Sequence, residues 1–565
     1  MGIDVSSLRG RRVMDRRNRA SIGDVFERQI WSRPDAVAIV AAADACEDPA
    51  HGQLTYGQAD ALANRIAHSL IDAGLQNGDV AVLVCDNSVE AIVTKVAMAK
   101  AGVVVAPLNP SLASEVIAEI LTRIEAKAAI VDAEHLPRLA STLAGTNVQV
   151  LAAIGVGDTH VEGTPSIGEF TAGKPTTEPD VEIHGDDIWQ LLFTSGSTAA
   201  PKAAMHSHHN TYYAALAWGP MLALRIPYER DAVFGSFLPV VFHTADAILV
   251  GTWLVGGTVV LGRRPDPKAL ARAISDEGVT TLWAGLPQFL AALVAAFEAD
   301  PTTSAASLQT ITYGWAPLEA DIYDGIQRVV GHDVSVQSVI GMTEVVVSHR
   351  FWLDQHEDLY RRTTPHDNYV GLPNPLLAAR IVDVEDNTQP IAQGLTGEVV
   401  YRSPAMMSGY YRDEESTATA MRGEWFHTGD LFGYGEDGQR MMVDRLKDVV
   451  KTGGENVSSI RVEAVLEKHP GVARAAVVGM PHPRWGEAVT AAIILAPGAT
   501  PTTEELIAYC KAHLAAYEVP KAVVLVDELP TSVGGKLQKH NVRTLLTTRL
   551  SHLASKGPRG TRAGG

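Results

Sequence analysis

Four hydroxyl side chains, a glycine and a lysine fall within nine residues, in the segment Thr194-Ser195-Gly196-Ser197-Thr198-Ala199-Ala200-Pro201-Lys202. Hydroxyls and backbone amides donate hydrogen bonds to phosphate oxygens, and the lysine adds a positive charge. The apolar run from Trp189 to Phe193 before the segment predicts a strand. This composition indicates a loop that grips a polyphosphate, although a polar turn after a strand could have the same residues.

The loop differs from the common P-loop, which needs G-x-x-x-x-G-K-[ST]. Here Pro201 precedes the lysine and Ala203 follows it, so a kinase or motor ATPase is disfavoured. The segment instead resembles the T-S-G-[ST]-T-G-x-P-K-G signature of the adenylate-forming superfamily. That superfamily contains acyl-CoA synthetases, peptide-synthetase adenylation domains and firefly-type luciferases.

The resemblance covers about residues 20–545, and two further segments follow in the superfamily's order. Gly314-Trp315-Ala316-Pro317 resembles the strand end at the adenine pocket. Ile340 and the following Gly341-Met342-Thr343-Glu344 resemble the G-x-T-E motif with the residue before it, and Thr343 and Glu344 are expected to be catalytic. The resemblance implies that Glu344 holds Mg²⁺ against the triphosphate, because a hard cation that bridges phosphates takes oxygen ligands.

A third segment, Thr428-Gly429-Asp430, resembles the T-G-D motif whose aspartate accepts hydrogen bonds from the ribose. An ionised carboxylate has two oxygens and no donor, which suits a vicinal diol. By the same resemblance, Arg445 touches the ribose and Lys447 occupies the hinge position. These residues complete an expected ATP and AMP site.

The segment from Leu529 to Leu537 resembles the P-x-T-x-x-G-K motif, which implies that Lys536 is the catalytic lysine. Attack of a carboxylate on the α-phosphate brings two anions together, so an ammonium that bridges both lowers the barrier. Removing such a group from a dry site costs about 2.7–4 kcal/mol.

The second half reaction of the resembling enzymes uses coenzyme A. In those enzymes the small domain swings about the hinge and presents a loop, here Gly453, Gly454 and Glu455, to a pantetheine tunnel. Glycines let a thin ligand pass closely but equally suit a plain turn. His243 follows a segment that resembles the one beside the acyl pocket, where it could orient the acyl carbonyl or be structural. The segment near Trp283 is expected to line the acid pocket.

Three residues depart from the superfamily's pattern on the adenylating side. Ala199 and Ala203 stand where it has glycine, and Ile340 stands where it has a tyrosine that stacks on adenine. An alanine forced to a positive φ costs about 1–2 kcal/mol, and a lost stack costs about 0.5–1.5 kcal/mol. If these costs apply together, adenylation slows by between about thirty-fold and several thousand-fold.

The composition is that of a globular protein with more than one core. The chain has 565 residues, of which 46% are hydrophobic and 20% are charged. This length predicts two or more domains. The net charge of -18 argues against a nucleic-acid partner. Three widely spaced cysteines, without metal-ligand spacing, fit a reducing compartment, so the expected location is the cytoplasm.

The N-terminus carries no apolar stretch of the kind that directs secretion. The longest weakly charged run, residues 247–262, is broken by Gly251, Gly256 and Gly257 and is too short to span a bilayer. No stable membrane insertion is therefore expected. A homodimer is the expected oligomer for a protein of this kind.

Strand and helix patterns alternate through the first 440 or so residues, which predicts α/β sheets covered by helices. Thr55 with Gln58 and Thr502 with Glu505 have the pattern of capping boxes at helix starts. A polar stretch with paired glycines marks a hinge before a smaller α+β domain. The predicted parts are a basic N-terminal arm (1–20), a large N-terminal body of several subdomains (21–444), a small mobile C-terminal domain (445–550) with its hinge near residue 447, and a disordered tail (551–565).

The resemblance implies an acyl-CoA synthetase that uses ATP, Mg²⁺ and coenzyme A to convert a hydrophobic carboxylic acid to its thioester through an acyl-adenylate. The departures keep open a homologue that transfers an acyl group only from a preformed adenylate. A luciferase, an enzyme that loads a carrier protein, an amide synthetase and a non-catalytic adenylate sensor are further alternatives. Lys536, Asp430 and Glu344 together speak against the sensor.

Overall fold

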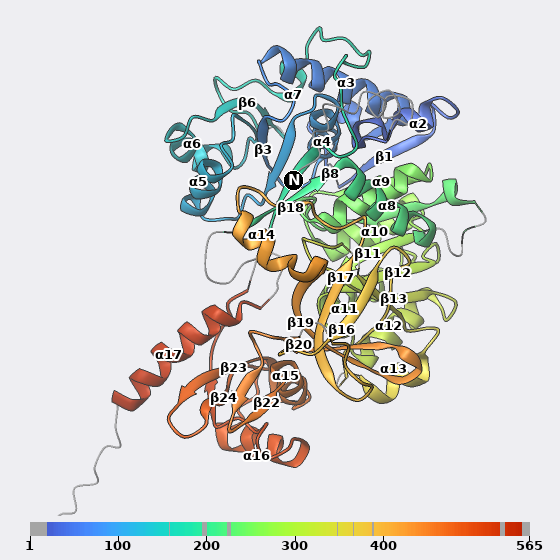
Figure 1. The fold of residues 1–565 in the computed structure, drawn as a ribbon. Coiled ribbons are helices and arrows are strands. Elements are labelled where there is room, and N and C mark those ends of the chain that lie inside the picture. Colours follow the sequence, from blue (N-terminus) through green and yellow to red (C-terminus); the bar gives the residue numbers. More distant parts are fainter. Residues whose placement is uncertain are drawn as a thin grey trace, which may run out of the picture.

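The computed structural model describes residues 20–43, 45–157, 159–194, 201–222, 226, 228–346, 348–364, 367–386, 389–531 and 537–555. These residues form three sheets covered by helices. Two sheets belong to a large N-terminal body, and the third belongs to a smaller C-terminal domain at the bottom of Figure 1. The predicted α/β fold class is confirmed.

The first sheet has seven strands in the order β18-β8-β7-β4-β3-β5-β6 and is mostly parallel. Alternate residues of β3 face opposite sides: Ala81 and Leu83 pack under α3 and α4, and Val82 packs under α5 and α6. The strands are β3 (Val80–Val84), β4 (Val104–Leu108), β5 (Ala128–Asp132), β6 (Gln149–Ile154), β7 (Ile188–Phe193), β8 (Ala203–Ser207) and β18 (Gly409–Tyr410). The helices that precede or flank them are α2 (Glu27–Ile30), α3 (Tyr56–Asp72), α4 (Val89–Lys100), α5 (Ser114–Arg123), α6 (Leu136–Ala144) and α7 (Ile167–Phe170).

The second sheet has thirteen strands in the order β16-β17-β19-β20-β15-β14-β13-β12-β11-β9-β10-β1-β2. Its strands are β1 (Val37–Ala42), β2 (Gln53–Thr55), β9 (Val233–Ser236), β10 (Thr258–Gly262), β11 (Thr281–Gly285), β12 (Thr310–Gly314), β13 (Ser335–Ile340), β14 (His349–Trp352), β15 (Tyr369–Pro373), β16 (Ala378–Val382), β17 (Thr396–Arg402), β19 (Phe426–Tyr434) and β20 (Arg440–Arg445). The helices of this half are α8 (His208–Leu222), α9 (His243–Leu254), α10 (Pro267–Glu277), α11 (Pro287–Ala299), α12 (Ala320–Val330), α13 (Glu357–Thr363) and α14 (Glu414–Ala420). Strands β9 to β13 run parallel, so their carboxyl ends share one edge.

The third sheet consists of β21 (Val450–Thr452), β22 (Glu455–Val457), β23 (Val472–His482), β24 (Gly486–Leu495) and β25 (Ala522–Leu525). One face of this sheet packs against α15 (Ser459–Glu467) and α16 (Thr503–His513), and the other packs against α17 (Lys539–Ser555). In Figure 1, α17 lies beside the sheet and points away from the N-terminal body. Alternation along β23 makes both faces apolar, since Val477 faces the first core and Val478 faces the second.

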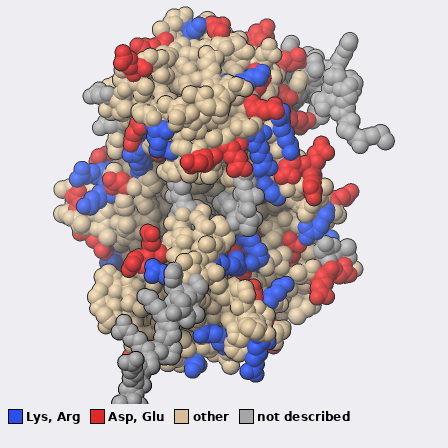
Figure 2. Space-filling view, turned by 90° about the vertical axis from the view of Figure 1, so that its left-hand side faces the viewer, with Lys and Arg blue, Asp and Glu red and all other residues tan. Residues whose placement is uncertain are grey.

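The predicted helix starts agree with the structure, whereas α17 continues to Ser555, five residues into the predicted disordered tail. Both capping boxes are present, with Thr55 and Thr502 accepting from the amides of Gln58 and Glu505. Among the described residues, no helix is both long and apolar enough to cross a membrane. On the face drawn in Figure 2, Lys and Arg side chains lie interspersed with Asp and Glu, without an extended basic patch.

Candidate active site

A cavity of about 890 Å³ lies where the N-terminal body meets the C-terminal domain. It brings together eight of the predicted site residues, which are Trp315, Ala316, Pro317, Ile340, Gly341, Asp430, Arg445 and Lys447. On the other side it is lined by C-terminal residues that include Leu537 and Gln538. These two directly follow Lys536, which lies outside the described residues. The segment that contains the predicted catalytic lysine thus leads into the same cavity as the predicted nucleotide residues.

The side of the cavity that is expected to bind adenine is built at the ends of two neighbouring parallel strands, β12 and β13. Gly314 ends β12, and a Cβ there would come within 2.7 Å of the carbonyl oxygen of Val339, so only glycine fits. Trp315 follows with φ of 68°, a conformation that a bulky residue rarely adopts outside a functional site. Its ring meets those of Trp283 and Phe242 edge to face, at centroid distances of 5.7 and 6.0 Å.

The side that is expected to bind the ribose rests on the antiparallel strands β19 and β20, which place Asp430 opposite Arg445. The Nε of Arg445 lies 3.4 Å from Oδ1 of Asp430, whose side chain is buried. Gly429 adopts φ of 71° and donates its amide to Oε1 of Glu398 at 2.9 Å. His427 contacts Oε2 of the same carboxylate at 2.7 Å. Glu398 therefore holds the turn that presents Asp430.

Charged residues also line the C-terminal side of the cavity. Arg543 donates to the carbonyl oxygen of Lys447 at 3.2 Å and lies 3.4 Å from Oδ1 of Asp448. Burial lowers the pKa of Lys447. Glu463 pairs with Lys539 at 2.9 Å, and burial raises the pKa of Glu463 to about 7. Arg543 thus connects α17 with the predicted hinge, and Lys539 connects α17 with α15.

Two histidines, whose rings are tilted by 46° to each other, share the carbonyl oxygen of Thr343. Nε2 of His206 lies 2.9 Å from this oxygen and Nδ1 of His243 lies 3.2 Å from it, while the two rings are 3.9 Å apart. A carbonyl only accepts, so both of these nitrogens carry protons. Burial lowers the pKa of His206 to about 4 and lowers that of His243 as well, which keeps both rings neutral.

The neutral tautomer of His243 leaves Nε2 with a free lone pair. This nitrogen is buried and has no hydrogen-bond partner among the described residues. It can accept a proton but cannot donate one. His243 is also the first residue of α9, next to Thr244, which lines the cavity.

The predicted phosphate loop joins the antiparallel strands β7 and β8. Its six central residues, Ser195, Gly196, Ser197, Thr198, Ala199 and Ala200, lie outside the described part of the chain. The ends of the loop are closed by a hydrogen bond of 2.9 Å from the amide of Thr194 to the carbonyl oxygen of Lys202. Ala203 pairs with Phe193 in the β7–β8 ladder and is not among the described residues with positive φ, so the expected strain does not arise there.

The side chain of Tyr410 contacts both Lys202 and Glu344. The hydroxyl of Tyr410 donates to Oε1 of Glu344 at 2.8 Å, and Nζ of Lys202 lies 4.9 Å from the centre of the Tyr410 ring. The second carboxylate oxygen of Glu344 makes no hydrogen bond to any described residue. A carboxylate oxygen without a hydrogen bond to the described residues can take a hard cation that bridges phosphates, so Glu344 suits the role expected for Mg²⁺. Met342, two residues earlier, forms a turn with Val345.

The expected coenzyme A loop lies apart from the cavity. Gly453 and Gly454, with φ of 61° and 90°, form the turn between β21 and β22, and Glu455 begins β22. None of these three residues lines the cavity. The conformation described thus groups the nucleotide residues with the segment after Lys536, and not with this loop.

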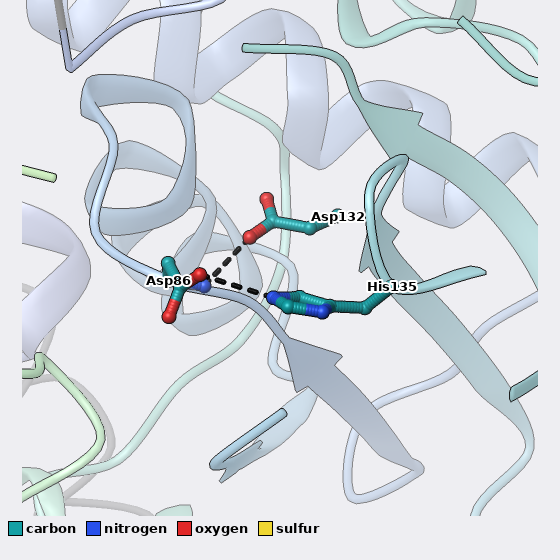
Figure 3. Close-up of side chains that lie close together, drawn as sticks. All are labelled: Asp86, Asp132 and His135. Carbon is teal, nitrogen blue, oxygen red and sulfur yellow. Dashed lines mark hydrogen bonds and ion pairs between the residues drawn. The ribbon is translucent and has the colours of Figure 1, made fainter. Parts of the chain in front are cut away.

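A second cluster with metal-ligand chemistry joins Asp86, Asp132 and His135 at the ends of β3 and β5 (Figure 3). Arg263 binds Asp132 at 2.9 Å and Arg264 binds Asp86 at 2.5 Å. Burial nevertheless raises the pKa of Asp132 to about 6. Because two guanidinium groups already neutralise the carboxylates, this cluster is a salt-bridge network that joins the first two sheets.

The layered fold and the cavity between the N-terminal body and the C-terminal domain agree with one protein family. Residues 26–411 match the family model described as AMP-binding enzyme, and residues 461–536 match that of the AMP-binding enzyme C-terminal domain. The chain therefore belongs to the AMP-binding enzyme family, as its resemblance to adenylate-forming enzymes predicted. A feruloyl-CoA synthase of Amycolatopsis sp is 32% identical over 495 residues, which cover 87% of this chain and 93% of that protein.

Two solved structures share the fold. ATP-bound MatB from Rhodopseudomonas palustris aligns with a TM-score of 0.79 and 27% identity, over 93% of this chain and 98% of that one. The amide bond synthetase McbA from Marinactinospora thermotolerans aligns with a TM-score of 0.77 and 29% identity, over 93% and 99%. Both alignments include the C-terminal domain, given the share of the chain that they cover.

Sequence reasoning missed His206, Glu398 and Tyr410. Each touches a residue of a predicted motif that is 31 or more positions away, so no local spacing connects the two. None of the three lies in a motif or strand predicted from the sequence. Only the strand order of the folded chain makes these contacts visible.

Proposed function

We propose that this chain is an ATP-dependent acyl-CoA synthetase that forms AMP. The observation that carries the proposal is the single cavity lined by residues of three separate motifs, by the hinge residue Lys447 and by the two residues after Lys536. The names of relatives support it, since a feruloyl-CoA synthase matches over most of both chains.

In the first half reaction, a carboxylate oxygen of the acid attacks the α-phosphorus of ATP and pyrophosphate leaves. Asp430 and Arg445 hold the ribose, and the ammonium groups of Lys202 and Lys536 offset the charge of the phosphates and the carboxylate. Mg²⁺, when held by Glu344, would further neutralise the phosphate oxygens.

In the second half reaction, the sulfur of coenzyme A attacks the acyl carbonyl carbon and the bond to AMP breaks. The C-terminal domain turns at Lys447 and brings Gly453, Gly454 and Glu455 toward the thiol path. Nε2 of His243, which has a free lone pair, accepts the thiol proton. This role differs from the expectation that His243 orients the acyl carbonyl, because Nε2 has no proton to donate.

The acid is hydrophobic and has an aromatic ring. Trp283, Trp315 and Phe242 form an edge-to-face group beside the cavity, and such a group favours a flat ring by offset or perpendicular contact. Trp283 makes a further edge contact with the buried Trp218, at a centroid distance of 6.4 Å. Bulky indoles at this position leave less room for a long alkyl chain than for a compact aryl acid.

The test is formation of acyl-CoA, followed by mass spectrometry over a panel of aryl, short-chain and long-chain acids. One series contains acid, ATP, Mg²⁺ and coenzyme A, and the other replaces acid and ATP with synthetic acyl-adenylates. Product from aryl acids in both series is the expected result. Product only from adenylates would instead establish the transfer-only homologue.

An amide synthetase is the second candidate, because McbA shares the fold at 29% identity. An amine would then replace the thiol, and its proton would pass to the same nitrogen of His243. An assay in which amines and coenzyme A compete for the acyl group distinguishes these two functions. Amide in place of thioester would favour this second function.

A further inference from the structure

Tyr410 touches both halves of the candidate triphosphate site. Its hydroxyl donates to Oε1 of Glu344 at 2.8 Å, and its ring faces the ammonium of Lys202 at 4.9 Å. Glu344 and Lys202 come from sequence segments 142 positions apart. One side chain therefore sets the distance between the expected cation ligand and the expected phosphate lysine.

The backbone holds Tyr410 firmly in this place. Strand β18 pairs with β8, so that Tyr410 lies opposite Ala204, two residues after Lys202. Its amide donates to Oγ1 of Thr417 at 2.9 Å, and the amide of Met407 donates to the carbonyl oxygen of Glu344 at 2.8 Å. The ring is buried, with 8% of Tyr410 exposed. The contacts thus belong to a rigid strand and not to a surface side chain.

Two properties of the phenol suit a dual role. A phenol hydroxyl is a hydrogen-bond donor, and that of Tyr410 donates to Oε1 of Glu344 at 2.8 Å. A donor on one carboxylate oxygen fixes the plane of the carboxylate and leaves the other oxygen available. The face of the ring carries partial negative charge, which attracts an ammonium before any phosphate is bound.

We propose that Tyr410 is a positioning residue of the triphosphate site, which orients Glu344 for a divalent cation through its hydroxyl and pre-positions Lys202 through its ring. The inference rests on the proposed function, since it assumes that ATP binds beside Lys202. The hydroxyl orients Glu344, and the ring pre-positions Lys202. Tyr410→Phe removes only the hydroxyl, whereas Tyr410→Leu removes both the hydroxyl and the ring.

The test measures ATP binding by calorimetry, without acid or coenzyme A, in the presence and absence of Mg²⁺. We expect Tyr410→Phe to bind ATP without Mg²⁺ as tightly as the wild type does. The factor by which Mg²⁺ increases the affinity for ATP should be about tenfold smaller in this variant. Tyr410→Leu should in addition weaken binding without Mg²⁺ by about threefold to tenfold. Tyr411→Phe, which removes a hydroxyl one residue away, is the matched control and should match the wild type in both conditions.

A double-variant cycle with Glu344→Gln tests the coupling. In that background Tyr410→Phe should cause no further loss of the Mg²⁺ effect, because the two changes remove one interaction. If Tyr410→Phe changes the melting temperature but not the Mg²⁺ dependence of ATP binding, the proposal is overturned and the role of Tyr410 is structural. Failure of the wild type to bind ATP would instead contradict the proposed function itself.

Discussion

At the scale of single residues, His243 is the group whose protonation the structure specifies most closely. Its Nδ1 donates to the carbonyl oxygen of Thr343, so Nε2 is an acceptor. We expect His243→Ala to slow thioester formation from a synthetic acyl-adenylate by about a hundredfold or more. Adenylation, measured by ATP–pyrophosphate exchange, should remain close to that of the wild type. Equal loss in both assays would contradict a role in proton transfer to this nitrogen.

His206 predicts how acid affects stability. Its pKa is about 4 in the folded protein and 6.5 ordinarily, so between these values only the unfolded chain binds a proton at this ring. Stability is therefore lost as the pH falls through this window. In His206→Gln this loss is absent, and the variant should retain about 2 kcal/mol more of its unfolding free energy between pH 7 and pH 5 than the wild type does. Denaturant titrations at pH 7 and pH 5 measure the unfolding free energy of both proteins. An equal change in this free energy between the two pH values, in wild type and variant, would refute the prediction.

At the scale of elements, a buried ion pair fixes the start of α9. Lys95 on α4 pairs with Asp246 in the first turn of α9 and donates to the carbonyl oxygen of Val240 at 3.1 Å. Asn87, just before α4, accepts from the amide of Val240 at 2.9 Å and donates to the carbonyl oxygen of Leu238 at 2.9 Å. These contacts anchor the loop that leads to His243.

Breaking this pair should be costly because it leaves one buried charge. We expect Lys95→Met to lower the free energy of unfolding by about 3–5 kcal/mol. Lys95→Met combined with Asp246→Leu should recover most of that loss, since no charge then remains buried. Chemical denaturation of the three proteins checks this, and a double variant as unstable as the single one would count against the pairing.

Elements formed by local rules could be predicted from the sequence, whereas their pairing could not. The Thr55 and Thr502 capping boxes and the strand Val80–Val84 follow from residue spacing and hydrophobic pattern alone. Strand β18 has only two residues and lies beside β8, which is about 200 positions earlier, so no periodicity reveals it. The contact of Tyr410 with Lys202 and Glu344 depends on that pairing and was invisible for the same reason.

At the scale of the whole molecule, the cavity depends on the placement of the C-terminal domain. Arg543 of α17 holds the carbonyl oxygen of Lys447, and Asp444 of β20 accepts from the amide and hydroxyl of Ser459 at 2.6 Å. Under the proposed function the loop Gly453 to Glu455 has to approach the cavity, and these contacts would then have to change. A turn at Lys447 would change them.

A proline at the hinge should separate the two half reactions. Lys447→Pro restricts φ at the point where the domain must turn. We expect it to keep ATP–pyrophosphate exchange within a few fold of the wild type and to lower thioester formation by at least tenfold. Lys447→Ala is the matched control, because it removes the side chain without restricting φ. Loss of both half reactions in the proline variant, with none in the alanine variant, would argue against a hinge at this residue.

The central claim is a two-step reaction through an acyl-adenylate. The most direct measurement is a single-turnover experiment with enzyme, an aryl acid, ATP and Mg²⁺, followed by mass spectrometry before and after addition of coenzyme A. We expect enzyme-bound acyl-adenylate and pyrophosphate first, then AMP and acyl-CoA in equal amounts, with the first products greatly reduced in Lys536→Ala. Release of ADP and phosphate, or thioester without a preceding adenylate, would contradict it.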